Sequence, residues 1–275
     1  THRGALLCEG PGVESVLRCR YHGRRFALDG RLLSMPEFDQ AVGFPRPQDD
    51  LPRLPLSIWR RFAFAALDPA VPFAAWVAEM EARIGFLPIE QAAFDPARSR
   101  DYLVRANWAL YCDNYLEGLH IPHVHPTLNA AVEYESYRTE LLRHSSLQIA
   151  LAKPGTPAFP AEDSGPHAGR RVAAYYAWVF PNLMLNFYPW GLSLNLVEPR
   201  GVDRTRVRFE AWIADRDAFE RCGADELDRI EFEDEAVVAE VQRGMRARLY
   251  ERGRYAPERE AAVHHFHRLL AAALA

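Results

Sequence analysis

Residues 107–126 read NWALYCDNYLEGLHIPHVHP, and this stretch carries the strongest pattern in the chain. Its histidines His120 and His125 are five residues apart, which on one continuous helix would point them about 140° away from each other. Pro122 and Pro126 forbid that helix, because proline removes a backbone donor and clashes with the preceding turn. We therefore predict a helix over 107–119, a break just after His120, and a return of His125 toward His120. Two imidazoles at a broken helix end make half of a metal site, although this spacing alone is common by chance.

A carboxylate on the buried stripe of a later helix is the candidate third ligand. The pattern predicts a helix over 225–251 whose apolar stripe comprises Leu227, Ile230, Val237, Val238, Val241 and Met245. Asp234 lies on the same stripe, whereas we expect its acidic neighbours to point elsewhere: Glu231, Glu233 and Glu235. A carboxylate in a core is costly unless it is paired or binds a metal, so a salt bridge to a core arginine is the alternative. Two histidines and one carboxylate with open positions are typical of non-heme Fe(II) oxygenases.

A second set of candidate metal ligands lies near the N-terminus. Cys19 and His22 form a C-x-x-H loop, and His2 precedes it. In a Rieske [2Fe–2S] centre two cysteines hold one iron and two histidines hold the other. An isolated C-x-x-H is a weak signal, and the upstream histidine strengthens it. The cysteine paired with His2 would directly precede Thr1, so we expect a cluster domain truncated at its start; Cys8 lies on the wrong side of His2 to replace it.

The other patterns divide the chain into a small β-rich part and a larger mixed part. In residues 1–66 we predict a hairpin over 24–33 that turns at Asp29-Gly30. Residues 67–275 are expected to form an α+β domain. Further strands are predicted over residues 15–20, 57–67, 173–180, 183–188, 192–197 and 206–212, and further helices over residues 73–84 and 257–274.

Composition limits the classes of partner. The 275 residues are 49% apolar and 25% charged with a formal net charge of −4, as in a soluble globular protein of one or two domains. Nucleic acids and anionic membranes would require a concentrated basic face, which the chain lacks. No apolar run reaches the roughly 18 residues that span a bilayer. Four irregularly spaced cysteines do not form a disulfide framework, so we expect a reducing, cytoplasmic setting.

Both sets of ligands resemble those of the large subunits of Rieske-type ring-hydroxylating oxygenases. The runs 2–7 and 19–26 resemble the family's Rieske domain, and the rest of the chain resembles its catalytic domain, with Asp234 opening an Asp-x(7)-Gln run. The resemblance implies an N-terminal all-β Rieske domain, residues 1–66, and a helix-grip catalytic domain with an antiparallel sheet, residues 67–275. It implies that the [2Fe–2S] cluster is bound by His2, Cys19 and His22, and a mononuclear Fe(II) by His120, His125 and Asp234.

The resemblance also implies a reaction and partners. Such an enzyme hydroxylates or oxidatively demethylates a small organic substrate, using O₂ and electrons from an NAD(P)H-dependent reductase or ferredoxin. The chain has no G-x-G-x-x-G fingerprint, so we expect the reductase to be a separate protein. Glu117, three residues before His120, can accept a hydrogen bond from the free nitrogen of that ligand. We expect Asp113 and Asn114 to be further partners of the iron ligands.

In the family, the carboxylate at the position of Glu117 links the iron site to the Rieske histidine of a neighbouring subunit in a head-to-tail homotrimer. Most ring dioxygenases have aspartate there. Glutamate resembles the monooxygenases and demethylases that act on choline, carnitine or betaine-like amines.

Several alternatives stay open. The substrate could be aromatic or a quaternary amine. A non-catalytic Rieske ferredoxin would need only the first 65 or so residues, a helix-grip ligand-binding protein would need no iron, and a zinc hydrolase could use the same three ligands. We expect His264, His265 and His267 to lie at the surface or at a subunit contact, and His123 either to line the pocket or to pack. A group of aromatic side chains should divide between core and substrate cavity: Tyr175, Tyr176, Trp178, Phe180, Phe187, Tyr188 and Trp190.

Overall fold

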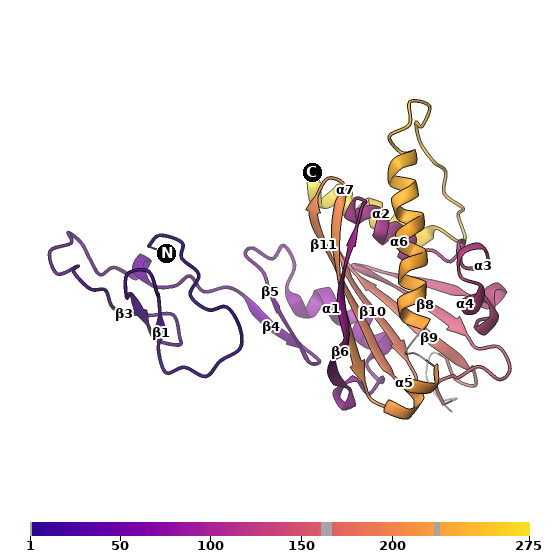
Figure 1. The fold of residues 1–275 in the computed structure, drawn as a ribbon, viewed down its shortest axis with the longest axis horizontal. Helices are drawn as coiled ribbons and strands as arrows, with labels where there is room; N and C mark the ends of the chain where they lie inside the picture. Colours follow the sequence, from indigo (N-terminus) through magenta and orange to yellow (C-terminus); the bar gives the residue numbers. More distant parts are fainter. Residues whose placement is uncertain (1, 161–166, 223–225) are drawn as a thin grey trace. The chain divides into compact units, whose positions relative to one another are not determined.

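A seven-stranded antiparallel sheet organises the larger part of the chain in the computed structural model, which describes residues 2–160, 167–222 and 226–275 (Figure 1). The strands follow the order β6-β12-β11-β10-β9-β8-β7. Their bounds are Ala93–Val104 (β6), Arg138–Leu142 (β7), Ser145–Leu151 (β8), Val172–Val179 (β9), Leu183–Tyr188 (β10), Gly191–Gly201 (β11) and Arg204–Ile213 (β12). The four strands predicted between residues 173 and 212 are confirmed, with β11 longer than predicted.

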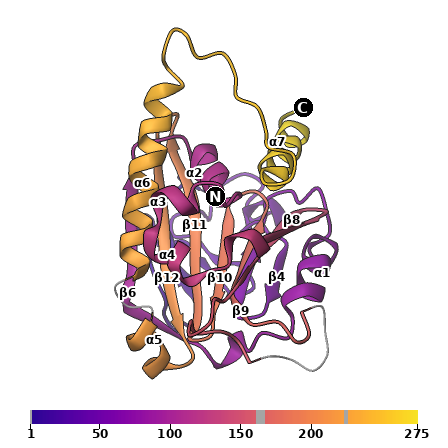
Figure 2. The same ribbon diagram turned by 90° about the vertical axis from the view of Figure 1, so that its right-hand side faces the viewer.

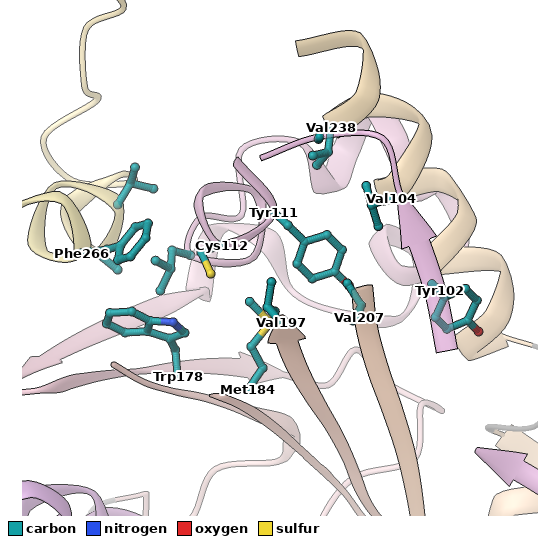
Figure 3. Packing of buried hydrophobic residues seen from close by; sticks show 14 of the residues in the cluster. Tyr102, Val104, Tyr111, Cys112, Trp178, Met184, Val197, Val207, Val238 and Phe266 are labelled. Atoms are coloured by element: carbon teal, nitrogen blue, oxygen red, sulfur yellow. The ribbon is translucent and has the colours of Figure 1, made fainter. Parts of the chain in front are cut away.

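One face of this sheet is covered by three helices. They are α2 (Trp108–Tyr115), α6 (Glu226–Gly244) and α7 (Ala261–Leu274). Side chains alternate between faces along a strand, so Tyr176 and Trp178 of β9 face these helices while Tyr175 faces away. Figure 3 shows the resulting core, in which sheet residues meet helix residues: Trp178, Met184, Val197 and Val207 against Tyr111, Cys112, Val238 and Phe266. This core holds α2 and α6 side by side over the strands.

The remaining helices are short, apart from α1. Helix α1 spans Phe73–Ile84 as predicted and packs against β8. Phe86, just after α1, contacts Tyr175, which places α1 on the sheet face opposite α2 and α6 (Figure 2). The short helices are α3 (Ile121–Val124), α4 (Pro126–Ala131) and α5 (Arg216–Cys222), with 3₁₀ turns at Pro47–Asp49 (η1), Ile89–Gln91 (η2) and Tyr134–Ser136 (η3).

The ends of α6 and α7 differ from the predictions. The predicted start of α6 at residue 225 lies outside the described residues, and the helix ends at Gly244 rather than at residue 251. Val241 and Met245, predicted on its buried stripe, are 44% and 42% exposed. Helices in proteins are stabilised mainly by packing, and after Val238 this one has little to pack on. Residues 245–260 form a long loop that leads to α7, which begins at Ala261 instead of residue 257 (Figure 2).

The N-terminal part contains two small antiparallel sheets. The first joins β1 (Leu17–Arg18), β2 (Arg25–Phe26) and β3 (Leu32–Ser34), and its hairpin turns at Asp29-Gly30 as predicted, with Gly30 at φ +90°. The second joins β4 (Leu56–Trp59) and β5 (Phe62–Ala65). The single strand predicted over 57–67 is therefore wrong, because Arg60 adopts a positive φ of 56° and turns the chain back on itself.

Contacts divide the chain into two compact units, Thr1–Ala70 and Val71–Ala275. The predicted domain boundary at residue 66 stays a prediction. Among the described helices, none combines the length and the apolar character that a membrane crossing requires.

Candidate metal centre

The helix that leads to the two histidines is shorter than predicted. Asn107 caps α2, since its side-chain oxygen accepts a hydrogen bond from the Ala109 amide at 3.0 Å. The helix ends at Tyr115, not at residue 119, and the chain turns at Leu116–Leu119, where the Leu119 amide donates to the Glu117 carboxylate. His120 then precedes α3, and His125 lies between α3 and α4. The predicted break is confirmed, but it comes before His120 instead of after it.

The two imidazoles and the distant carboxylate converge. His120, His125 and Asp234 each offer one ligand atom, and these atoms lie within 4.8 Å of one another. The Asp234 Oδ1 atom is 3.0 Å from His125 Nε2 and 3.6 Å from His120 Nε2. His125 is buried and the other two side chains are only 15% and 17% exposed. Among the described residues, Asp234 forms ion pairs with these two histidines, so the predicted alternative of a salt bridge to a core arginine is wrong there.

Each histidine is held by a carboxylate at its other ring nitrogen. His120 Nδ1 lies 2.5 Å from Glu117 Oε1, and His125 Nδ1 lies 2.7 Å from Glu233 Oε2. A carboxylate at Nδ1 retains the proton there, which leaves the Nε2 lone pair for a metal. Both Nε2 atoms face Asp234. The donor set, with two nitrogens and one oxygen, therefore fits a metal of the kind that non-heme Fe(II) enzymes use.

Electrostatics at His125 follow from the same contacts. Burial disfavours its charged form, but the hydrogen bonds to Asp234 and Glu233 outweigh burial and raise the pKa of His125. Asn114 Nδ2 also donates to Asp234 Oδ1 at 2.6 Å, as expected for a partner of this ligand. In α6 the carboxylate of Asp234 is thus oriented by α2.

Three expectations about neighbouring acids need correction. Glu233 does not point away from Asp234, because it bonds His125, and Glu231 is buried against Tyr111, whose hydroxyl donates to its carboxylate at 2.6 Å. Asp113 does not approach the iron ligands; its carboxylate lies 2.8 Å from His267 Nε2 on α7. Successive helical residues point about 100° apart, so Asp113 and Asn114 cannot share one target.

A cavity of about 100 Å³ adjoins the three ligands. Two of the aromatic residues considered from sequence line it, Tyr176 and Tyr188, and so do three tyrosines and a phenylalanine that were not considered: Tyr111, Tyr115, Tyr137 and Phe209. Trp178 lies in the core, and Tyr175 and Phe187 line a separate hollow on the opposite sheet face. His123 is exposed and is not part of the lining described.

The N-terminal candidates also share one pocket. His2, Cys19 and His22 line a cavity of about 60 Å³, and the rings of His2 and His22 are 4.9 Å apart between centroids. The C-x-x-H loop closes on itself, because the Gly23 amide donates to the Cys19 carbonyl at 3.1 Å with Gly23 at φ +75°. One thiol and two imidazoles around a small hollow fit a Rieske cluster. The exposed Cys8 is not among the residues that line it.

Comparison with protein families places both centres in known domains. The family model for the ring-hydroxylating alpha subunit (catalytic domain) matches residues 89–275, and the model for the Rieske [2Fe-2S] domain matches residues 1–54. The catalytic-domain match alone covers more than half of the chain.

Two groups of curated relatives span almost all of the chain. Choline monooxygenase of Arabidopsis thaliana, a chloroplastic enzyme, is 30% identical over 98% of this chain and 66% of its own length. The carnitine monooxygenase oxygenase subunit of Escherichia coli (strain K12) is 28% identical over 98% of this chain and 75% of its own length. The chain spans less than two-thirds of the plant choline monooxygenases, with shares of 60–66%.

Solved structures share the fold. A quaternary ammonium Rieske monooxygenase in complex with its substrate L-carnitine aligns with a TM-score of 0.73 at 22% identity, over 98% of this chain and 75% of that chain. Naphthalene 1,2-dioxygenase from Rhodococcus sp. aligns with a TM-score of 0.70 at 19% identity, over 96% and 77%. The predicted architecture, a Rieske domain followed by an α+β domain with an antiparallel sheet, is confirmed. The chain belongs to the ring-hydroxylating alpha-subunit family of Rieske-type oxygenases and is related within it to the choline and carnitine monooxygenases.

Proposed function

We propose that this chain is the oxygenase component of a Rieske non-heme iron enzyme that hydroxylates or oxidatively demethylates a small quaternary amine. The observation that carries the proposal is the convergence of His120, His125 and Asp234, each with its own supporting hydrogen bond. In this proposal residues 1–66 form the Rieske domain and residues 67–275 the catalytic domain.

The proposed metal ligands follow from the geometry. His120, His125 and Asp234 would hold iron through Nε2, Nε2 and a carboxylate oxygen, and His2, Cys19 and His22 would contribute to the cluster. When bound, the iron supplies the binding and reductive activation of O₂, and the cluster supplies electrons one at a time. Glu117 and Glu233 keep the Nδ1 protons in place, and Asn114 holds Oδ1 of Asp234, the carboxylate oxygen that faces both histidines.

Glu117 has a further proposed role between subunits. Its carboxylate already bonds His120 and is only 14% exposed. We expect a head-to-tail homotrimer in which this carboxylate also contacts a Rieske histidine of the neighbouring subunit, and a separate NAD(P)H-dependent reductase or ferredoxin as electron donor. A role for Asp113 in the chemistry would have to act through His267, its hydrogen-bond partner.

The lining of the cavity favours a quaternary amine over an aromatic acid. Its described residues include three carboxylates, Glu117, Glu231 and Asp234, and no lysine or arginine that could bind a substrate carboxylate. Five tyrosines and Phe209 also line it, and aromatic faces attract quaternary ammonium groups. The names of the relatives, choline and carnitine monooxygenase, point to the same class of substrate.

Oxygen consumption tests the proposal. The full-length protein, loaded with iron and cluster and supplied with NADH and a reductase, should consume O₂ when given choline or glycine betaine. The variant His120→Ala should not, and its folding is checked by circular dichroism. Substrate turnover at the wild-type rate by His120→Ala, or a wild-type protein that binds iron and consumes no O₂ with either quaternary amines or aromatic acids, would contradict the proposed function.

A further inference from the structure

A second buried carboxylate, that of Glu231, lines the same cavity as the proposed metal ligands but does not hold any of them in place. Glu231 is 5% exposed and lies on α6 one turn before Asp234, on the wall of the same cavity. The ligands have other partners, namely Glu117, Glu233 and Asn114. Glu231 therefore provides none of these hydrogen bonds to the proposed metal ligands.

The hydrogen-bond partner of Glu231 that the structure describes is a neutral hydroxyl. Its carboxylate accepts a hydrogen bond from the Tyr111 hydroxyl at 2.6 Å. Further along the cavity wall, Ser193 Oγ bonds Asn195 Oδ1 at 3.2 Å. Among the residues that the structure describes, no lysine, arginine or histidine forms an ion pair with Glu231. Burial, together with nearby carboxylates, raises the pKa of Glu231 to about 8.

A buried carboxylate without a cationic partner is costly in its charged form, and a positive charge that comes from outside the chain would favour that form. Two such charges can reach this wall: the metal and a bound substrate. The proposed metal site already has Asp234 as its carboxylate ligand, and in the described part of the chain the carboxylate of Glu231 bonds Tyr111 and neither imidazole. The space in front of Glu231, in contrast, is the aromatic cavity that Tyr111, Tyr176 and Phe209 help to line.

We infer that Glu231, presented by Tyr111, is the specificity-determining counter-charge for the cationic head of the substrate in this cavity. The inference rests on the proposed function and deepens it, because it assigns the recognition of positive charge to one side chain. Aromatic rings supply a cation–π surface for any quaternary ammonium. The carboxylate adds a full negative charge to this surface and so increases the preference for a cation over a neutral molecule of the same shape.

A pair of isosteres tests the assignment directly. Choline and 3,3-dimethyl-1-butanol have the same shape, but only choline is charged. Their binding to the anaerobic iron-loaded holoenzyme is measured by titration calorimetry, so that no turnover is needed. The wild type should prefer choline, and Glu231→Gln should weaken choline binding roughly 30-fold or more while the affinity for the neutral isostere stays the same.

Two further variants keep the test decisive. Glu231→Asp retains the charge and should retain the preference for choline, and Glu240→Gln, on an exposed position of the same helix, should behave as wild type. If Glu231→Gln does not fold, Tyr111→Phe removes the hydrogen bond that presents the carboxylate and should lower the preference without abolishing it.

The outcomes that overturn the inference differ from those that overturn the proposed function. A wild type that binds choline and its neutral isostere equally, or a Glu231→Gln variant with unchanged preference, overturns the inference while oxygenase activity stands. Loss of iron from Glu231→Gln with the preference intact also overturns it, because the carboxylate would then balance the metal charge. Absence of O₂ consumption by the wild type with every substrate class contradicts the proposed function, and the binding comparison is still informative.

Discussion

Replacement of Glu233 tests whether a residue outside the ligand set determines metal affinity. Its carboxylate lies 2.7 Å from His125 Nδ1, and the two side chains are 27% and 1% exposed, so water screens this pair less than a surface pair. A hydrogen bond that involves a charged group contributes about 1.5–3 kcal/mol, and loss of such a partner costs metal sites about 10- to 100-fold in affinity. Glu233→Gln keeps an acceptor for the Nδ1 proton and loses only the charge, so its loss of Fe(II) affinity should lie near the lower end of this range. Glu233→Ala removes the acceptor, so its loss of Fe(II) affinity should lie near the upper end.

The assay is an anaerobic titration of the metal-depleted protein with Fe(II), followed by calorimetry. The titration is run at pH 8.5, where protons compete least for the imidazole nitrogens. Glu240→Gln is the matched control, because Glu240 lies on the same helix, is 72% exposed and pairs only with Arg243 at 3.6 Å in the structure described. If Glu233→Ala binds Fe(II) within about twofold of Glu240→Gln, the carboxylate does not orient His125 for a metal and our account of the site is wrong.

Three further predictions concern stability. The folded-state pKa of Glu231 is raised from 4.5 to about 8, so its burial opposes folding increasingly as the pH rises through that interval. In the metal-free protein, the free energy of unfolding of Glu231→Gln relative to wild type should therefore increase by roughly 3–5 kcal/mol between pH 5 and pH 8.5, as measured by urea unfolding. The hydrogen bond that His267 donates to the Asp113 carboxylate raises the pKa of His267, partly offset by burial, so this pair stabilises the fold below pH 6.5 and the stabilisation is lost as the pH rises through the folded pKa. Because His267 is 37% exposed, Asp113→Asn should lower the free energy of unfolding by only about 0.5–1 kcal/mol at pH 6 and by less at pH 9, as thermal melts would show. Phe266 is fully buried between Trp178 and α2, so Phe266→Ala should cost about 3–5 kcal/mol in the same unfolding experiment, and a loss below 1 kcal/mol would mean that α7 is not part of the core.

Sequence patterns singled out the three proposed metal ligands because each of them breaks a local rule. His120 and His125 flank Pro122, which a helix accommodates only in its first turn, where α3 has it, and Asp234 places a charge on an apolar stripe. Glu233 breaks no such rule, because an acid beside other acids on a helix is ordinary solvent-facing sequence. Its contact with His125 depends on how α6 is rotated over α2, and that rotation is determined by core packing between elements more than 100 residues apart.

Strand prediction succeeded and failed for a similar physical reason. Strands β9 and β10 are rich in aromatic and branched residues and are buried on both faces, so their composition indicates a sheet. Strand β6 lies at the edge of the sheet, contains Pro96 and is rich in charged residues, because an edge strand is partly exposed to solvent. No alternating apolar pattern therefore indicates this strand in the sequence. The sequence also led us to expect Glu231 to point away from the buried stripe, whereas it is buried and accepts a hydrogen bond from the Tyr111 hydroxyl on α2.

Helix α6 contributes to the candidate metal site in two ways. Asp234 faces His125 Nε2 while its neighbour Glu233 bonds Nδ1 of the same ring, so α6 holds this imidazole at both nitrogens. His120 depends on its own loop, through Glu117. Docking of α6 on α2, which Gln242 supports by accepting a hydrogen bond from the Asn107 amide at 2.8 Å, therefore delivers one ligand and orients another in a single step. Because a bound metal would join all three ligands, its binding energy also stabilises the contact between these two helices, and folding of this part of the chain and metal binding are thermodynamically linked.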